Sequence, residues 1–175
     1  MSYIRGYDSE TLREIVDTVA CADRLAEIET QRSLPALLER VWLLKVLDRL
    51  DEALELSEEA VRQARMAGTR KDVVRARVLH ATVLQHRGAH AAAEQVLMTC
   101  AEEAEGQRWA HVAAFAHQHR GKNALDAGDF ELAKESFKRS LFLRRETGAA
   151  DAALESVLVA LETVERRRVG EPAVV

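Results

Sequence analysis

The side chains best suited to chemistry in this 175-residue sequence are its six histidines and two cysteines. His117 and His119 are two residues apart, so on a helix they point to nearly opposite sides. His86 and His90 stand on either side of Gly88, which interrupts the helical spacing that a two-histidine metal site uses. No cysteine or carboxylate cluster completes either pair. We therefore expect no metal site and no cofactor.

The sequence also lacks the pattern of a catalytic site. It shows no nucleophile beside a base and no glycine loop that could hold a phosphate. The carboxylate pairs Glu58–Glu59 and Glu102–Glu103 are expected on solvated helix faces. Cys21 and Cys100 have no disulfide or metal spacing, and Cys100 takes the place of a small packing residue. We predict that this protein is not an enzyme.

Charge and hydropathy exclude two further classes of function. The net charge is −4, and residues of both signs are interspersed along the chain. The main basic concentration is Arg166–Arg168, with Arg139 and Arg144–Arg145 before it, and it lacks the aromatic residues of a nucleic-acid surface. No apolar run has the length of a membrane span, and the first residues lack the apolar core of a secretion signal. We expect a cytoplasmic protein that binds neither nucleic acid nor membrane.

The elements that must position any site repeat with a fixed period. The Gly128–Asp129 turn is followed by small residues at Ala133 and Ser140, and the same frame recurs 40 residues earlier with Ala93 and Cys100. It recurs once more at Ala53 and Ala60. A fixed period of helix–turn–helix units is typical of a stacked repeat array.

Apolar spacing and turn residues place the helices within this frame. After a lead-in at residues 1–7, we predict an N-terminal helix in 8–31 with Asp8 or Ser9 as its cap. Three helix pairs follow in 34–148, then a capping helix in 149–168 and a tail in 169–175. Together they would form a single domain, 1–175, that is all-α.

The helix pairs resemble the tetratricopeptide repeat (TPR) family. TPR units place small residues where their two helices touch. Here these positions hold Val41, Ala81 and Gly121 on the first helices of the pairs. On the second helices they hold Ala53, Ala60, Ala93, Cys100, Ala133 and Ser140. The period of 40 differs from the usual 34, and it is similar to a subclass found in bacterial regulators and cargo-adaptor light chains. The resemblance implies a right-handed superhelical array of about eight helices.

The resemblance also implies a binding surface. In TPR arrays the first helix of each unit lines a concave groove that contacts the partner. The groove positions carried over to this chain are Leu38, Trp42, Lys45, Arg75, Thr82, Gln85, Phe115, Gln118 and Lys122. Aromatic and cationic side chains on one surface would suit a peptide with apolar anchors and acidic groups.

Three functions remain open. The first is a protein–protein interaction scaffold, or adaptor, that holds a peptide or helix of a partner in the groove. The second is a regulatory sensor module that binds a small signalling peptide or metabolite. The third is a structural homo-oligomer, for instance a homodimer, that pairs through Leu12, Ile15, Leu158 and Leu161.

Overall fold

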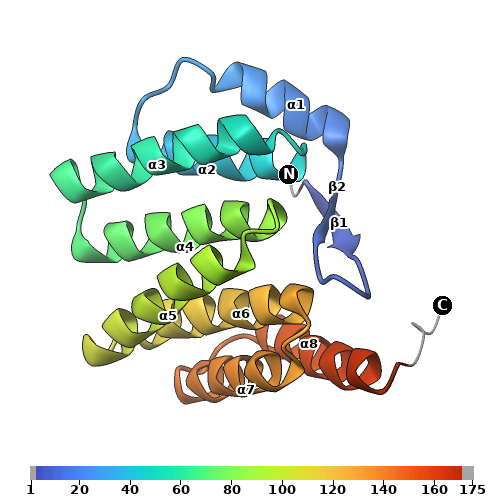
Figure 1. Cartoon of the computed structure of the whole chain (residues 1–175). Coiled ribbons are helices and arrows are strands. Elements are labelled where there is room, and N and C mark those ends of the chain that lie inside the picture. Colours follow the sequence, from blue (N-terminus) through green and yellow to red (C-terminus); the bar gives the residue numbers. More distant parts are fainter. Residues whose placement is uncertain (1–2, 171–175) are drawn as a thin grey trace. The chain divides into compact units, whose positions relative to one another are not determined.

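The computed structural model describes residues 3–170, and within this range the chain is mainly helical, with one small two-stranded sheet (Figure 1). Its contacts group into two compact units. The first unit contains the residues up to Asp8 together with Arg13–Ala89, and the second contains Ser9–Leu12 together with the residues from His90 onward. The prediction of a mainly helical chain is confirmed.

The first unit consists of a small hairpin and four helices. Strands β1 (Ile4–Tyr7) and β2 (Glu14–Val16) pair antiparallel. They precede helices α1 (Thr18–Glu27), α2 (Leu34–Val46), α3 (Leu50–Ala67) and α4 (Arg70–His86). Each of these helices packs against the next one along the chain. Their shared core contains Cys21, Ile28, Val41, Leu43, Ala53 and Val83.

The second unit repeats the design with helices α5 (His90–Gly106), α6 (Ala110–Ala127), α7 (Phe130–Glu146) and α8 (Asp151–Val169). Consecutive helices again pack side by side (Figure 1). Phe137 is fully buried and is the largest side chain in the core. It packs in a cluster with Leu12, Leu125, Ala133, Val157 and Val164.

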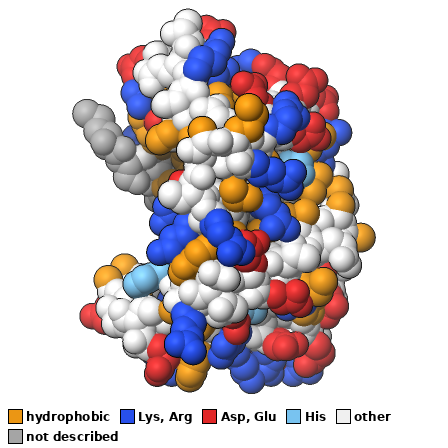
Figure 2. Space-filling model, turned by 90° about the vertical axis from the view of Figure 1, so that its left-hand side faces the viewer, with side chains coloured by type: hydrophobic (Ala, Val, Ile, Leu, Met, Phe, Trp, Pro, Cys, Tyr) orange, Lys and Arg blue, Asp and Glu red, His pale blue; other side chains and the backbone are white. Residues whose placement is uncertain are grey.

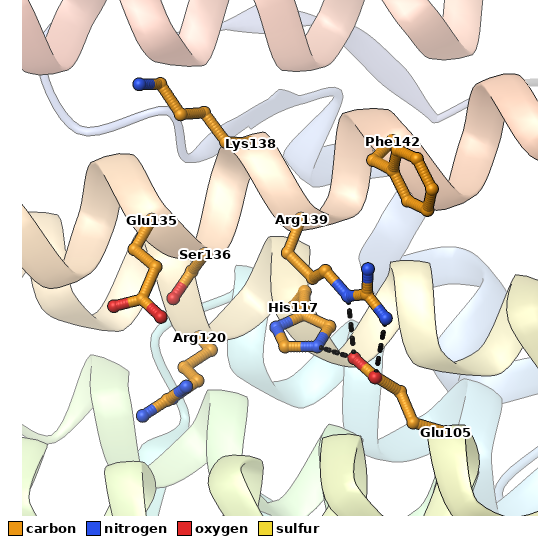
Figure 3. A pocket seen from close by; sticks show the side chains of 8 residues that line it. All are labelled: Glu105, His117, Arg120, Glu135, Ser136, Lys138, Arg139 and Phe142. Atoms are coloured by element: carbon orange, nitrogen blue, oxygen red, sulfur yellow. Dashed lines mark hydrogen bonds and ion pairs between the residues drawn. The ribbon is translucent and has the colours of Figure 1, made fainter.

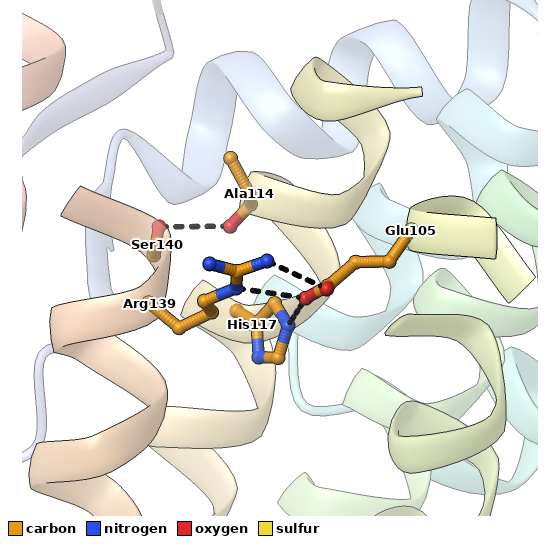
Figure 4. Close-up of polar contacts among 5 residues, drawn as sticks. All are labelled: Glu105, Ala114, His117, Arg139 and Ser140. Atoms are coloured by element: carbon orange, nitrogen blue, oxygen red, sulfur yellow. Dashed lines mark hydrogen bonds and ion pairs between the residues drawn. The ribbon is translucent and has the colours of Figure 1, made fainter. Parts of the chain in front are cut away.

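The 40-residue frame is visible in both packing and backbone. The small residues expected at helix contacts are all buried, namely Ala53, Ala60, Ala93, Cys100, Ala133 and Ser140. Ser140 in addition donates a hydrogen bond from Oγ to the Ala114 carbonyl at 2.8 Å (Figure 4). The turn between the helices of each pair has a left-handed residue at the same frame position, with φ of 60° at Asp48, 77° at Gly88 and 80° at Gly128. Small residues allow the helices of a pair to approach closely.

The prediction of a helix over residues 8–31 is wrong in its first half. Ile4 pairs with Val16 and Tyr7 with Glu14, so residues 14–16 form a strand and the residues expected to be a lead-in form its partner. Leu12 has a φ of 57°, which a helix does not permit. Helix α1 begins only at Thr18, where the Asp17 side chain accepts a hydrogen bond from the Ala20 N–H at 3.0 Å. The β-branched Ile15 and Val16 are favourable in a strand. Whether they form a helix or a strand depends on pairing with β1, and the local sequence pattern does not show this pairing.

The C-terminal end agrees more closely with the sequence. The capping helix predicted in 149–168 corresponds to α8, which Gly170 ends with a φ of 75°. Of the predicted tail, Val169 belongs to α8 and residues 171–175 lie outside the described residues, as do residues 1–2 of the predicted lead-in. Within residues 3–170, no helix has both the length and the apolar character needed to cross a membrane.

Candidate functional site

A pocket of about 440 Å³ lies in the second unit, where the end of α5 meets α6 and α7 (Figure 3). Most of the side chains that line it are polar or charged, and Phe142 supplies its aromatic side. The lining residues are Glu105, His117, Arg120, Glu135, Ser136, Lys138, Arg139 and Phe142.

Glu105 is the centre of the pocket's hydrogen bonds (Figures 3 and 4). Arg139 donates to both of its carboxylate oxygens, from Nε at 3.0 Å and from Nη2 at 2.7 Å. His117 Nε2 lies 2.7 Å from the Glu105 oxygen that also accepts from Nε. The Arg139 hydrogen bonds, and after them the His117 contact, lower the pKa of Glu105 to about 2. Glu105 is therefore ionised at neutral pH, and one carboxylate fixes side chains from two helices.

His117 and Ser136 leave polar atoms in the pocket wall without partners. Burial lowers the pKa of His117 despite the nearby Glu105, so the imidazole is neutral at neutral pH. Because a carboxylate only accepts hydrogen bonds, Nε2 carries the hydrogen and Nδ1 is left as an acceptor. His117 Nδ1 and Ser136 Oγ are both buried and have no hydrogen-bond partner within residues 3–170.

The rim of the pocket combines an aromatic ring with cations. The Arg139 guanidinium lies 5.2 Å from the centre of the Phe142 ring, and 52% of Phe142 is exposed. Arg120 is paired with Glu94 at 2.7 Å. On the face drawn in Figure 2, basic and acidic side chains are likewise interspersed among small hydrophobic patches. The pocket can therefore take a polar group beside an apolar one.

We predict that Glu105→Gln destabilises the protein at neutral pH by about 1–2 kcal/mol, because it removes charge-assisted hydrogen bonds at a partly exposed site. Between a pKa of 4.5, the ordinary value, and about 2, the unfolded chain binds more protons at Glu105 than the folded one. The stability that Glu105 contributes is thus lost as the pH falls through this window. Urea unfolding of both proteins at about pH 7 and about pH 3 measures the difference.

The two unfolding curves should differ most at the higher pH and less at the lower one, which lies within this window. The exposed Glu135→Gln, a change of the same type in the same pocket, serves as the control and should leave stability nearly unchanged. A pH-independent difference between wild type and Glu105→Gln would show that the carboxylate charge does not hold this network.

Three of the predicted groove residues, Lys45, Thr82 and Gln85, are buried and offer little side-chain surface to a partner. Lys45 is 3% exposed, with its Nζ 3.6 Å from a Glu14 carboxylate oxygen. Thr82 donates from Oγ1 to the Leu79 carbonyl at 2.7 Å, and Gln85 is buried as well. The structure has a strand at Glu14 where the sequence predicts a helix, and this strand brings Glu14 to Lys45.

The other groove residues differ in their surroundings. In the first unit Arg75 is exposed and Leu38 is half-buried. Trp42 packs on the core, and the centre of its ring lies 6.5 Å from the centre of the Tyr3 ring. In the second unit Phe115 is 40% exposed beside His119, Gln118 accepts a hydrogen bond from Arg144, and Lys122 donates to the Leu12 carbonyl at 2.9 Å. None of the nine lines the pocket around Glu105.

The histidines mostly serve packing. His80 Nδ1 lies 2.8 Å from Ser57 Oγ, and His90 Nδ1 lies 3.1 Å from Asn123 Oδ1. His86 bonds the Thr82 carbonyl, and burial, with Lys45 and Arg13 nearby, lowers its pKa to about 4. In the part of the chain that the structure describes, no group of three or more His, Cys, Asp or Glu could hold a metal ion.

Sequence reasoning missed the pocket, although one signal was present. Glu105 occupies the frame position that holds Arg65 and Arg145 in the other two units. A reversed charge at a repeated position indicates a local role that the other repeats do not share. The side chains that bind the Glu105 carboxylate are those of His117 and Arg139, which are 12 and 34 residues away in the sequence. They contact Glu105 only in the folded chain.

Comparison with known protein families finds no matching family, and comparison with curated proteins finds no matching relative. Among solved structures, the chain is similar to the crystal structure of BtubC (BKLC) from P. vanneervenii, with a TM-score of 0.65 and 17% sequence identity. The likeness concerns the fold alone. The alignment covers 87% of this chain and 65% of BtubC.

Proposed function

We propose that this chain is a TPR-like helical array that serves as a protein–protein interaction scaffold. Helix pairs with a 40-residue frame and small buried residues at the frame positions support the repeat-array part of this proposal, and the similarity to BtubC supports the helical fold alone. Arrays of this kind stack so that each unit covers its neighbour's apolar side, and the remaining surface is free to bind. The cytoplasmic location and the superhelical arrangement stay predictions.

The observation that carries the proposal is the pocket around Glu105. Its rim presents Phe142, half exposed and next to Arg139, and aromatic and arginine side chains are enriched at protein interfaces. Glu105 holds Arg139 in place, so less side-chain entropy is lost on binding. A segment of a partner could place an apolar side chain against Phe142 and a polar group toward His117 and Ser136.

Phe142→Ala tests this proposal. The variant should lower the affinity for the partner about tenfold, as expected when an interface loses about 1.4 kcal/mol at one anchor. Immobilised wild type and variant are compared for the proteins that they retain from a lysate of the source organism. Met66→Ala, which truncates another exposed apolar side chain in the first unit, is the matched control.

Retention of a specific protein by wild type and Met66→Ala but not by Phe142→Ala would support the scaffold function at this pocket. Equal retention by all three would exclude Phe142 from the interface and with it this assignment of the site. The variants should be equally folded, because both side chains are exposed.

The pocket volume favours a second function, the sensor of a small ligand. About 440 Å³ lies within the range of small-molecule sites, and both a ring and unpartnered polar atoms face it. A metabolite that binds there should raise the melting temperature of wild type without any partner protein. The homo-oligomer is less well supported, because Leu12 is buried and Leu161 packs on the core, which leaves only Ile15 and Leu158 of the four predicted residues exposed.

A further inference from the structure

A four-residue segment, Ser9–Leu12, is held on α6 and α8 by side chains that bind its backbone. Thr163 Oγ1 and Arg166 Nη2 both donate to the Ser9 carbonyl, the former at 3.3 Å. Arg167 Nη1 donates to the Glu10 carbonyl at 3.3 Å, and Lys122 Nζ to the Leu12 carbonyl at 2.9 Å. We call these four donors the α6–α8 surface. Ser9–Thr11 form a turn between β1 and β2. Hydrogen bonds to backbone carbonyls recognise the shape of this turn and do not depend on its side chains.

Two side chains of the segment add specificity. The Glu10 carboxylate lies 3.4 Å from Arg166 Nη2. Leu12 is only 4% exposed and belongs to the same cluster as Leu125, Val157 and Val164. The α6–α8 surface thus recognises an acidic side chain followed two residues later by a leucine, while its four donors bind the carbonyl oxygens of Ser9, Glu10 and Leu12.

The segment joins the two strands of the hairpin, and its own backbone is strained. Its contacts place it in the second unit, although the residues on both sides, Asp8 and Arg13, belong to the first. Leu12 is held at a φ of 57°, a left-handed conformation that is costly for a leucine. A segment that fits the same surface without this strain would have an advantage over the chain's own residues.

We infer that the α6–α8 surface is a docking site for a turn-forming segment of a partner protein with an acidic residue two positions before a leucine. Ser9–Leu12 is its resident occupant and competes with the partner from within the chain. The surface contains none of the residues that line the Glu105 pocket, so this inference does not rest on the function proposed for that pocket.

A fluorescent peptide with the sequence of residues 7–14, YDSETLRE, tests the inference in fluorescence anisotropy titrations of the full chain. In the Leu12→Asp variant the buried carboxylate should expel the resident segment and open the surface. The peptide should then bind at least about tenfold more tightly than to wild type, as expected if the surface is free in no more than about a tenth of wild-type molecules.

The companion variants show whether the peptide binds at the expected place. Adding Lys122→Ala to Leu12→Asp should weaken binding, because a donor to the peptide backbone is lost. A peptide in which the leucine is replaced by aspartate should not bind. Leu12→Ala, a milder change, provides a second open variant in case Leu12→Asp does not fold, as judged by its melting curve. Met66→Ala should bind like wild type.

Equal affinity for wild type and for a folded open variant, or no binding to either open variant, would overturn the inference. A dimer of wild type in light scattering that is lost in Leu12→Ala would also overturn it, because the occupant would then be a second copy of the chain. The Phe142→Ala retention experiment can succeed or fail independently of these titrations, so the two surfaces are judged separately.

Discussion

Phe137→Ala should lower the free energy of unfolding by about 3–5 kcal/mol, the usual cost of removing a fully buried phenylalanine. Phe137 is the largest fully buried side chain, and from α7 it packs against α6 and α8 in a cluster with Leu125, Ala133 and Val157. Its neighbours are held on separate helices, so they cannot collapse fully into the space that the ring leaves. Much of the cost should therefore be the cavity itself.

Urea unfolding followed by circular dichroism measures this loss as a lower transition midpoint. Phe142→Ala is a matched control, because it makes the same change on the same helix at a position that is 52% exposed. It should change the unfolding free energy by no more than about 0.5 kcal/mol. If both variants lost the same stability, the cluster around Phe137 would not be the core of the second unit.

Gly121→Ala should also destabilise the protein, although alanine is normally the better residue inside a helix by up to about 1 kcal/mol. A Cβ at position 121 would lie 2.7 Å from both Cδ1 and Cε1 of the Phe137 ring. This contact is too short for any real Cβ, and the ring is enclosed by the core. We expect a net loss of about 1–3 kcal/mol from overpacking, which outweighs the gain in helix propensity.

A double variant identifies the cause. Phe137→Leu alone should be destabilising, because it removes ring atoms from the core. In combination with Gly121→Ala, however, the smaller side chain at position 137 leaves room for the new methyl group. The double variant should therefore lose less unfolding free energy than the sum of the losses of the two single variants. A coupling energy of about 0.5–3 kcal/mol is typical of residues in contact. Strict additivity would mean that the two side chains do not meet, and a stabilised Gly121→Ala would show that α6 and α7 are less closely packed.

These two predictions concern the contact on which the second unit depends. The pocket around Glu105 and the α6–α8 surface are both built on helices α6 and α7 or α8, whose spacing Gly121 and Phe137 set. A variant that moves these helices apart should therefore weaken binding at both surfaces. Variants of Phe142 or Lys122 should affect one surface each.

Most of the helices could be predicted from the sequence, because their signals are local. Turn residues at Gly88 and Gly128 and small residues at Ala93, Ala133 and Ser140 repeat every 40 residues, and the helices begin and end close to the expected positions. Within a helix, each hydrogen bond joins residues four apart, so the pattern that specifies it lies within the segment itself.

Only the tertiary structure decided that the N-terminal residues form a hairpin, and which residues the predicted groove side chains contact. Ile15 and Val16 fit a helix or a strand equally well by spacing, and pairing with β1 selected the strand. That strand brings Glu14 to Lys45, and the segment before it brings the Leu12 carbonyl to Lys122, so two expected groove cations bind the chain itself.

The pocket around Glu105 could not be predicted from the sequence either, because it also depends on contacts between distant residues. Glu105, His117 and Arg139 come from three helices, and their side chains meet only when those helices pack. The sequence determined the helices and their period through contacts between near neighbours. The candidate sites depend on contacts between distant residues, and a local pattern carries no information about which distant residues will meet.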